Sequence, residues 1–372
     1  MSGTDTTNTT DTPARGWAAL ALPARTASGI EAVLLSALAL IVAFALFGVF
    51  VALQGHDPVA VYRTLWLGAF GTRFSIENTL TLAAPIVLTA LATLIPARIG
   101  LLVIGGEGAL ILGGLGAVLA GVALSGLPGA LGAVLCCVAG ALTGALWLAF
   151  AGALKHWRGV NETISTLLLN YIAIALMLHL VTGPLRDLDV PIKAQSWSIP
   201  ETFRMGDIPG WSVHWGLPIG VAVVACIHIL IRHTVTGFSM AILGGNRRAA
   251  QMAGLDIGRL TLLACALGGA SAGLAGAIEV VAVHGAASES LVVGFGYTGI
   301  LVAFLARQNA LAVLVVALII GGIAASGGLL QRRFGLPDAA TDLLQGTIFL
   351  CVLASNALAG RLIPGRLIPG SR

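Results

Sequence analysis

The segment that decides the fold is LTLLACALGGASAGLAGAIEVVAV, residues 260–283. It is long enough to cross a bilayer, because a spanning helix needs about 20 apolar residues. Its single charged residue is Glu279, and Gly276, Ala275 and Ala272 lie three, four and seven positions before it. Small residues at this helical spacing favour close packing between membrane helices. The segment therefore predicts a transmembrane helix whose carboxylate faces neighbouring helices rather than lipid.

The composition extends this prediction to the whole chain. Of its 372 residues, 57% are hydrophobic, 10% are charged and 49 are glycine. An average soluble domain has about 25% charged residues, so this chain cannot cover an ordinary water-facing surface. High hydrophobicity excludes a disordered protein, and five scattered Cys exclude a disulfide-stapled secreted module. The sequence predicts an all-α, polytopic transmembrane helical bundle.

The chain divides into two tails and one membrane domain. Residues 1–29 are expected to be a disordered tail, residues 30–358 the transmembrane domain, and residues 359–372 a basic tail. The first apolar run starts too late and is too long for a cleaved signal peptide. About ten spans are expected, at 30–53, 78–95, 108–125, 128–154, 163–182, 215–231, 260–283, 291–306, 310–330 and 341–358.

Basic residues in the loops predict the orientation in the membrane. If both termini are cytoplasmic, thirteen of the twenty Lys and Arg residues lie on the inner side. The loop at 232–259 carries four Arg against one acid and is assigned to the inside, whereas the loop at 183–214 is assigned to the outside. The expected location is the inner (cytoplasmic) membrane, as a multi-pass protein. The bases are spread over both faces, so nucleic-acid binding is excluded.

Several motif matches do not carry chemistry. The stretch 294–299 spells the dinucleotide fingerprint Gly-Phe-Gly-Tyr-Thr-Gly, but it has no βαβ context and no acid about 20 residues on. We interpret its glycines as flexibility or close helix contact. The two lysines, Lys155 and Lys193, are not followed by Ser or Thr, so the chain has no phosphate-binding loop for ATP. No catalytic residue, metal site or cofactor is expected in this chain.

A few ionisable or polar side chains lie within the apolar runs. A charge at mid-helix costs about 2.5–3.5 kcal/mol on insertion scales, so such residues mark either helix contacts or solute paths. Glu279, with His284 as a partner, is equally compatible with both roles. Glu107 is favoured at a helix start by the helix dipole alone, and Asn170 by hydrogen bonds across helices. A role in the solute path stays open for all four.

The inner loop contains a short capped helix. Asn246 is a good N-cap, residues 247–253 have helical character, and Gly254 ends the helix. Such a basic helix in a long inner loop could dock a cytosolic partner or could be an ordinary structured loop.

At these residues the sequence resembles the ABC-transporter permeases of the branched-chain amino acid and simple-sugar type, most closely the nucleoside branch. Five segments in the family's order carry the resemblance: 99–108, 161–171, 243–254, 276–285 and 294–300. The family commonly has Asn before Ile-Gly and Gln after Glu-Gly, where this chain has Val103 and Ala109. These departures put the solute in doubt more than the transport role.

The resemblance implies a set of partners. It implies a second, related permease subunit in a heterodimer, a cytoplasmic ATPase that binds ATP, and an extracytoplasmic solute-binding lipoprotein. The residues of the coupling helix that would contact the ATPase are Gly245, Asn246, Arg247, Ala250 and Gly254. The solute, a nucleoside or related compound, would pass Glu107, Asn170, Glu279 and His284 by alternating access.

Other functions fit the sequence less well. A proton-coupled secondary transporter would use Glu279 as the coupling carboxylate, but it would have no need of an ATPase-docking helix. A permease for simple sugars or branched-chain amino acids is the alternative within the same class. A membrane-embedded enzyme would need a nucleophile–base pair or a metal cluster within the spans, which the sequence lacks.

Overall fold

The computed structural model describes residues 24–190 and 193–362. This part of the chain is helical and contains no strand. Its longer helices are α1 (Ala24–Leu53), α2 (Pro58–Phe70), α3 (Arg73–Ala97), α4 (Gly106–Ala123), α5 (Gly129–Arg158), α6 (Glu162–Thr182), α7 (Gly216–His233), α8 (Val235–Gly245), α10 (Ile257–Ile278), α11 (Phe295–Leu305), α12 (Ala310–Ala325), α13 (Gly327–Phe334) and α14 (Ala339–Leu362). The short ones are α9 (Arg247–Met252), the single 3-10 turns η1 (Glu201–Phe203) and η3 (Glu289–Leu291), and the π-helical turn η2 (Glu279–His284).

The predicted helical membrane bundle is confirmed, and the predicted number of spans is not reached. Every predicted apolar run lies on a helix, but seven helices in the described part are long and apolar enough to span a membrane. An eighth span is possible if Ala37–Leu53 and Pro58–Phe70, bent by 116°, are counted as one. The runs at 291–306 and 341–358 coincide with shorter apolar helices. The ten-span topology and the sidedness of the termini therefore stay predictions.

The predicted domain boundaries differ slightly from the helix ends. α1 begins at Ala24, directly after Pro23, although residues 24–29 were assigned to the tail. α14 continues to Leu362, past the expected end at residue 358. Residues 1–23 and 363–372 of the two predicted tails lie outside the described residues. α2 was not predicted, because Arg63 interrupts its apolar pattern.

Glycines bring α4, α5 and α10 into backbone contact. A Cβ atom on Gly276 of α10 would collide with the Leu110 carbonyl oxygen of α4. One on Gly113 of α4 would collide with the Gly273 backbone of α10, and one on Gly144 of α5 would meet Gly273 as well. The predicted small-residue stripe before Glu279 is thus a packing surface, in which Ala272 and Ala275 are also fully buried. In a bilayer, such close approach replaces the hydrophobic effect as the source of helix association.

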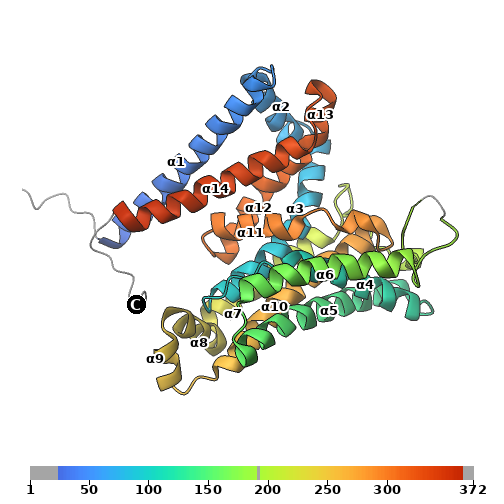
Figure 1. Cartoon of the computed structure of the whole chain (residues 1–372). Coiled ribbons are helices and arrows are strands. Elements are labelled where there is room, and N and C mark those ends of the chain that lie inside the picture. The colour runs from blue at the N-terminus through green and yellow to red at the C-terminus, as the bar shows by residue number, and fades with distance from the viewer. Residues whose placement is uncertain (1–23, 191–192, 363–372) are drawn as a thin grey trace, which may run out of the picture.

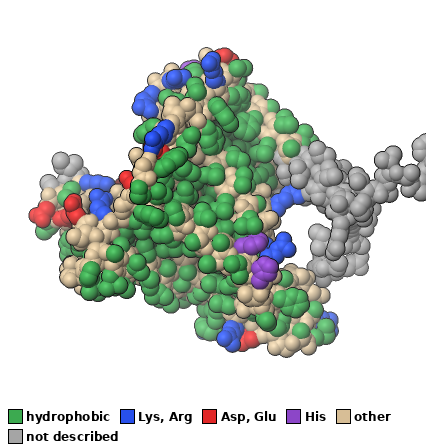
Figure 2. All heavy atoms as spheres, turned by 180° about the vertical axis from the view of Figure 1, so that it is seen from behind, with side chains coloured by type: hydrophobic (Ala, Val, Ile, Leu, Met, Phe, Trp, Pro, Cys, Tyr) green, Lys and Arg blue, Asp and Glu red, His purple; other side chains and the backbone are tan. Residues whose placement is uncertain are grey.

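The helices form layers that run in roughly the same direction (Figure 1). α1 packs along α14 on one side of the molecule, and α4, α5, α6 and α10 form the other side. α3 lies between them and contacts α7, α10, α11 and α12. α8 and α9 lie at one end of the long helices, while the loop that follows α6 lies at the other (Figure 1). The face in Figure 2 is largely hydrophobic, with basic side chains gathered toward its margins, as a lipid-facing surface requires.

Candidate functional site

Glu107 joins the beginnings of two helices. It lies in the first turn of α4, and only 1% of its surface is exposed. Its carboxylate accepts hydrogen bonds from the backbone amides of Gly294 at 2.8 Å and Gly296 at 2.6 Å, at the start of α11. Amides at a helix N-terminus have no partner within the helix and carry partial positive charge, which a carboxylate satisfies. Glu107 does begin a helix, as predicted, but its side chain caps a different one.

The glycines of the segment 294–299 serve this contact. A Cβ atom on Gly296 would collide with the Glu107 backbone, and one on Gly299 would lie 2.6 Å from Thr89 Oγ1. Gly294 itself has φ of +90°, a left-handed conformation that glycine adopts without a steric cost. In the described structure no strand precedes this segment. The interpretation as close helix contact fits this geometry, and a dinucleotide-binding turn does not.

Asn170 ties α6 to the start of α4 and reaches toward α11. It is fully buried, and its Oδ1 accepts a hydrogen bond from the Gly108 amide at 2.9 Å. Its Nδ2 donates to the Ile104 carbonyl at 2.9 Å and to the Tyr297 hydroxyl at 3.4 Å. Buried amides in membrane bundles form such bridges between helices. Asn170 therefore holds the Tyr297 hydroxyl in position through a hydrogen bond.

Glu279 and His284 form a separate pair near the end of α10. Glu279 is 5% exposed and opens the π-helical turn η2. Its Oε2 lies 3.6 Å from His284 Nε2, so the predicted pairing is present. His284 Nδ1 is in turn 3.4 Å from Ser290 Oγ. π-helical turns within α-helices are rare and mark functional sites or local strain.

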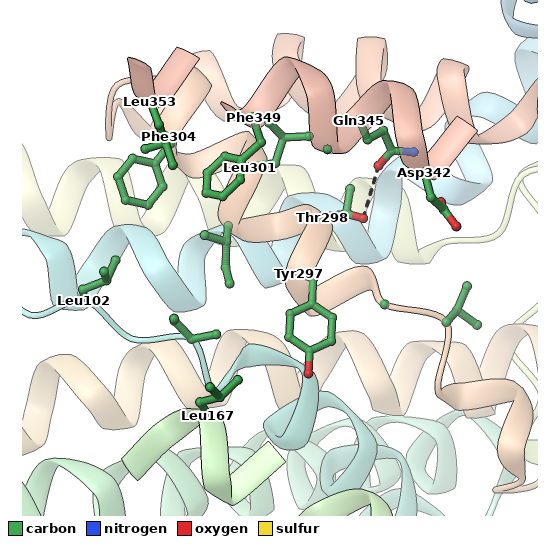
Figure 3. A pocket seen from close by; sticks show the side chains of 15 residues that line it. Leu102, Leu167, Tyr297, Thr298, Leu301, Phe304, Asp342, Gln345, Phe349 and Leu353 are labelled. Atoms are coloured by element: carbon green, nitrogen blue, oxygen red, sulfur yellow. Dashed lines mark hydrogen bonds between the residues drawn. The ribbon is translucent and has the colours of Figure 1, made fainter. Parts of the chain in front are cut away.

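A cavity lies elsewhere, between α11 and α14. Its volume is about 630 Å³, which is within the range of small-molecule sites. Fifteen residues from the α3–α4 loop, α6, the start of α11 and α14 line it: Leu102, Ile104, Leu167, Val293, Gly294, Tyr297, Thr298, Ile300, Leu301, Phe304, Asp342, Gln345, Gly346, Phe349 and Leu353. Figure 3 shows the Tyr297 ring within this space, with α14 across from it.

The walls of the cavity are apolar and its polar groups are few. Thr298 of α11 and Gln345 of α14 face each other, with 3.4 Å between Thr298 Oγ1 and Gln345 Oε1 (Figure 3). Asp342 lies one turn before Gln345 on α14, and the Tyr297 ring is 41% exposed. Aromatic rings stack on planar groups, while a few convergent polar groups fix the orientation of a ligand. The cavity can therefore hold a small, partly planar, polar solute.

The predicted path residues do not line this cavity directly. Glu107 and Asn170 stand one layer behind it, because each bonds to a lining residue, Gly294 or Tyr297. Glu279 and His284 form the separate pair described above, and neither is among the lining residues of this cavity. Tyr297, Thr298, Asp342 and Gln345 were not predicted as site residues. A usable signal was present, since Asp342 and Gln345 are polar residues at i, i+3 in an otherwise apolar run.

The predicted coupling residues form a compact helix–turn unit. Asn246 caps α9, since its Oδ1 accepts hydrogen bonds from the amides of Arg248 at 2.9 Å and Ala249 at 3.0 Å. Gly254 has φ of +72° and follows α9, as expected of a helix stop. Ala250 lies on the inner side of α9 and is fully buried. Arg247 on α9 and Gly245 at the end of α8 are exposed. This unit presents a small basic surface on a rigid base.

A chain of close contacts leads from α8 to the cavity. A Cβ atom on Gly244 of α8 would collide with the carbonyl oxygen of Arg98, at the end of α3. Further along α3, Thr89 Oγ1 donates a hydrogen bond to the Phe295 carbonyl of α11 at 2.9 Å. α11 carries Tyr297 and Thr298 into the cavity. Rigid, packed elements of this kind can transmit a displacement between distant sites.

Comparison with known proteins places the fold and the site in a family context. Residues 75–353 match the family described as the permease component of branched-chain amino acid transport systems. The guanosine ABC transporter permease protein NupP of Bacillus subtilis is 30% identical over 86% of this chain and 93% of its own length. The glucose ABC transporter permease protein TsgB13 of Haloferax volcanii is 29% identical over 86% of each chain. The nucleoside ABC transporter permease protein NupB of Lactococcus lactis subsp. cremoris is 25% identical, with 86% of this chain and 90% of its own covered.

Proposed function

Because the chain belongs to the family of permease components of branched-chain amino acid transport systems, we propose that it carries nucleosides through the membrane. It is a multi-pass protein of the cytoplasmic membrane and the membrane-spanning subunit of an ABC transporter. As a transport subunit it works with an ATPase and a solute-binding protein. The remaining features of the proposal concern the solute, the partner permease and the coupling.

The cavity between α11 and α14 is the observation that carries the choice of solute. Its volume of about 630 Å³ suits a nucleoside, and the Tyr297 ring offers a surface on which a base can stack. Thr298, Gln345 and Asp342 supply donors and acceptors for a ribose or a base edge. Two of the similar proteins are named for guanosine or nucleosides, and one for glucose. A simple sugar is therefore the competing solute, while branched-chain amino acids rest on the family description alone.

The assembly and topology follow the same proposal. The chain pairs with a second, related permease in a heterodimer, and an extracytoplasmic lipoprotein delivers the solute. Both termini are cytoplasmic, and the shorter apolar helices count toward ten spans. The chain itself binds no ATP and no other cofactor, so the energy for transport comes from the ATPase.

The proposed mechanism is alternating access through the packed chain of helices. ATP binding closes the ATPase dimer and displaces the coupling unit Gly245, Asn246, Arg247, Ala250 and Gly254. The displacement passes through α8 to the end of α3 and on to α11. Because Glu107 clamps the start of α11 to α4, the two helices move together and the wall of the cavity shifts. Glu107 and Asn170 thereby act on the solute path by positioning the residues that line it. Glu279 and His284 belong to the path at the C-terminal end of α10, the end away from the coupling unit.

The proposal is tested by uptake into vesicles that contain the full transporter. ATP-dependent uptake of radiolabelled guanosine, glucose and leucine is compared for the wild type and for Tyr297→Ala. Loss of base stacking, worth about 1–3 kcal/mol, should weaken guanosine affinity by about 5- to 150-fold. The control is Leu350→Ala, which alters an exposed residue of α14 outside the cavity. Uptake of glucose or leucine without guanosine would contradict the proposed solute.

A further inference from the structure

A second cavity lies at the end of the molecule where α8 is found. Its volume is about 360 Å³, and it is enclosed by α7, α8, the end of α3 and the α11–α12 loop. Its lining includes Arg98, His228, Arg232, Arg307 and Phe238. The four basic side chains come from three separate parts of the chain, the end of α3, α7 and the α11–α12 loop, so the fold, and not local sequence, gathers them. In Figure 2, basic and histidine side chains gather at one margin of the molecule.

The described lining of this cavity is basic. Three arginines and one histidine line it, and none of its described lining residues is acidic. Burial lowers the pKa of Arg98, and the positive charge of nearby Arg232 lowers it further. Neighbouring like charges repel each other, and a bound anion removes this repulsion. The cavity is therefore set up electrostatically to receive negative charge.

One nitrogen of the Arg98 guanidinium group forms a hydrogen bond, whereas another has no hydrogen-bond partner. Its Nη2 donates to the Gln308 carbonyl at 2.6 Å, which fixes the side chain against the α11–α12 loop. Its Nε is buried and has no hydrogen-bond partner. A buried donor without an acceptor costs about 1–3 kcal/mol. The same loop places Arg307 and Gln308 at φ of 49° and 57°, a left-handed backbone that is unusual for residues other than glycine.

We propose that this cavity binds the phosphate group of an anionic ligand, either a lipid headgroup or soluble phosphate. Arginine forms paired, charge-assisted hydrogen bonds to phosphate oxygens, and three arginines converge here. Basic pockets between membrane helices are known to hold anionic headgroups. Ile231 and Phe238 give the cavity apolar walls that can lie against an acyl chain. The site is distinct from the solute cavity and does not depend on which solute is carried.

Two binding measurements on the purified full-length protein separate the two sources. In the first, the protein is incubated with phosphatidylglycerol or phosphatidylcholine, and retained lipid is counted by native mass spectrometry. In the second, inorganic phosphate is titrated and the unfolding temperature is followed. Retention of phosphatidylglycerol over phosphatidylcholine identifies the lipid as the source, whereas a saturable rise in unfolding temperature identifies soluble phosphate.

Arginine variants decide whether the effect belongs to this cavity. Binding to Arg232→Gln/Arg307→Gln should fall by about tenfold or more, because two charge-assisted contacts are lost. Arg232→Lys keeps the charge and should retain part of the binding even if the double variant folds poorly. The matched control, Arg158→Gln, removes an exposed arginine at the end of α5 and should bind like the wild type. The proposal is overturned if the wild type prefers neither ligand, or if the double variant binds as well as Arg158→Gln.

Discussion

At the scale of single residues, burial turns a few polar groups into structural joints. The position of Glu107 at a helix start could be predicted from the two glycines before it. Its partners could not, because Gly294 and Gly296 are 187 and 189 residues away and nothing local encodes that pairing. Asn170 is similar: its mid-span position predicted bonds across helices, whereas the Tyr297 contact required the fold. The sequence therefore identifies which polar groups are held by hydrogen bonds, whereas the packing of the helices decides which groups they bond to.

Replacement of Glu107 should show how much the joint to α11 stabilises the protein. Glu107→Ala leaves the buried Gly296 amide and the half-buried Gly294 amide without their acceptor, and the buried donor alone costs about 1–3 kcal/mol. Glu107→Gln keeps one acceptor oxygen and should lose less. Thermal unfolding of the purified protein measures both, with the exposed Glu289→Ala as the control. Equal unfolding temperatures for Glu107→Ala and Glu289→Ala would refute the joint.

At the scale of helices, the sequence revealed the packing stripes but not their partners. The small residues before Glu279 predicted one close-packed face of α10, and the structure seats that face on α4 and α5. The choice among neighbouring helices depends on matching two glycine stripes at the right depth, which periodicity in one helix does not contain. α2 was missed for a different reason, since Arg63 interrupts its apolar pattern, and the helix packs on α3, α12 and α13.

The close contact at Gly276 should tolerate no side chain. Gly276→Ala drives a methyl group into the Leu110 carbonyl oxygen, which is backbone and cannot rotate away. Overpacking of this kind costs about 1–3 kcal/mol, so the unfolding temperature in detergent should fall. Gly328→Ala is the matched control, because a Cβ atom there meets nothing within 4 Å. A fall in both variants, or in neither, would show that the stripe does not hold α10 to α4.

The helix α9 should couple transport to ATP without contributing to solute binding. Asn246→Ala removes the cap that holds the Arg248 and Ala249 amides, which costs about 0.5–2 kcal/mol and frays the helix. Combined with Arg247→Glu, it should reduce both ATPase stimulation and uptake in reconstituted vesicles while solute affinity stays unchanged. The control is Arg158→Glu, an exposed charge reversal on α5. If the double variant keeps wild-type ATPase stimulation and wild-type uptake, α9 does not couple transport to ATP.

At the scale of the whole molecule, the cavity lies between α11 and α14, whereas the coupling helix α9 lies at one end of the long helices. The path between them runs through contacts between α8, α3 and α11. The cavity could not be predicted, because its lining comes from four regions between residues 102 and 353 that only the tertiary fold assembles. The bundle, by contrast, followed from composition, since a chain with 10% charged residues has few other stable forms.

The orientation of the bundle is the last feature to test. The excess of Lys and Arg in the loop at 232–259 predicts that α9 faces the cytoplasm, and the loop that follows α6 should then face outward. In intact cells a membrane-impermeant maleimide should label Asp187→Cys at once, and should label Arg247→Cys only after permeabilisation. The five native cysteines are controlled by the unsubstituted protein. Asp187 follows the end of α6 at Thr182, whereas Arg247 lines a small cavity with Lys155 and His156, shortly before the start of α6 at Glu162. The two positions should therefore label from opposite sides. Labelling of Arg247→Cys in intact cells would invert the orientation and move the ATPase-docking surface off α9.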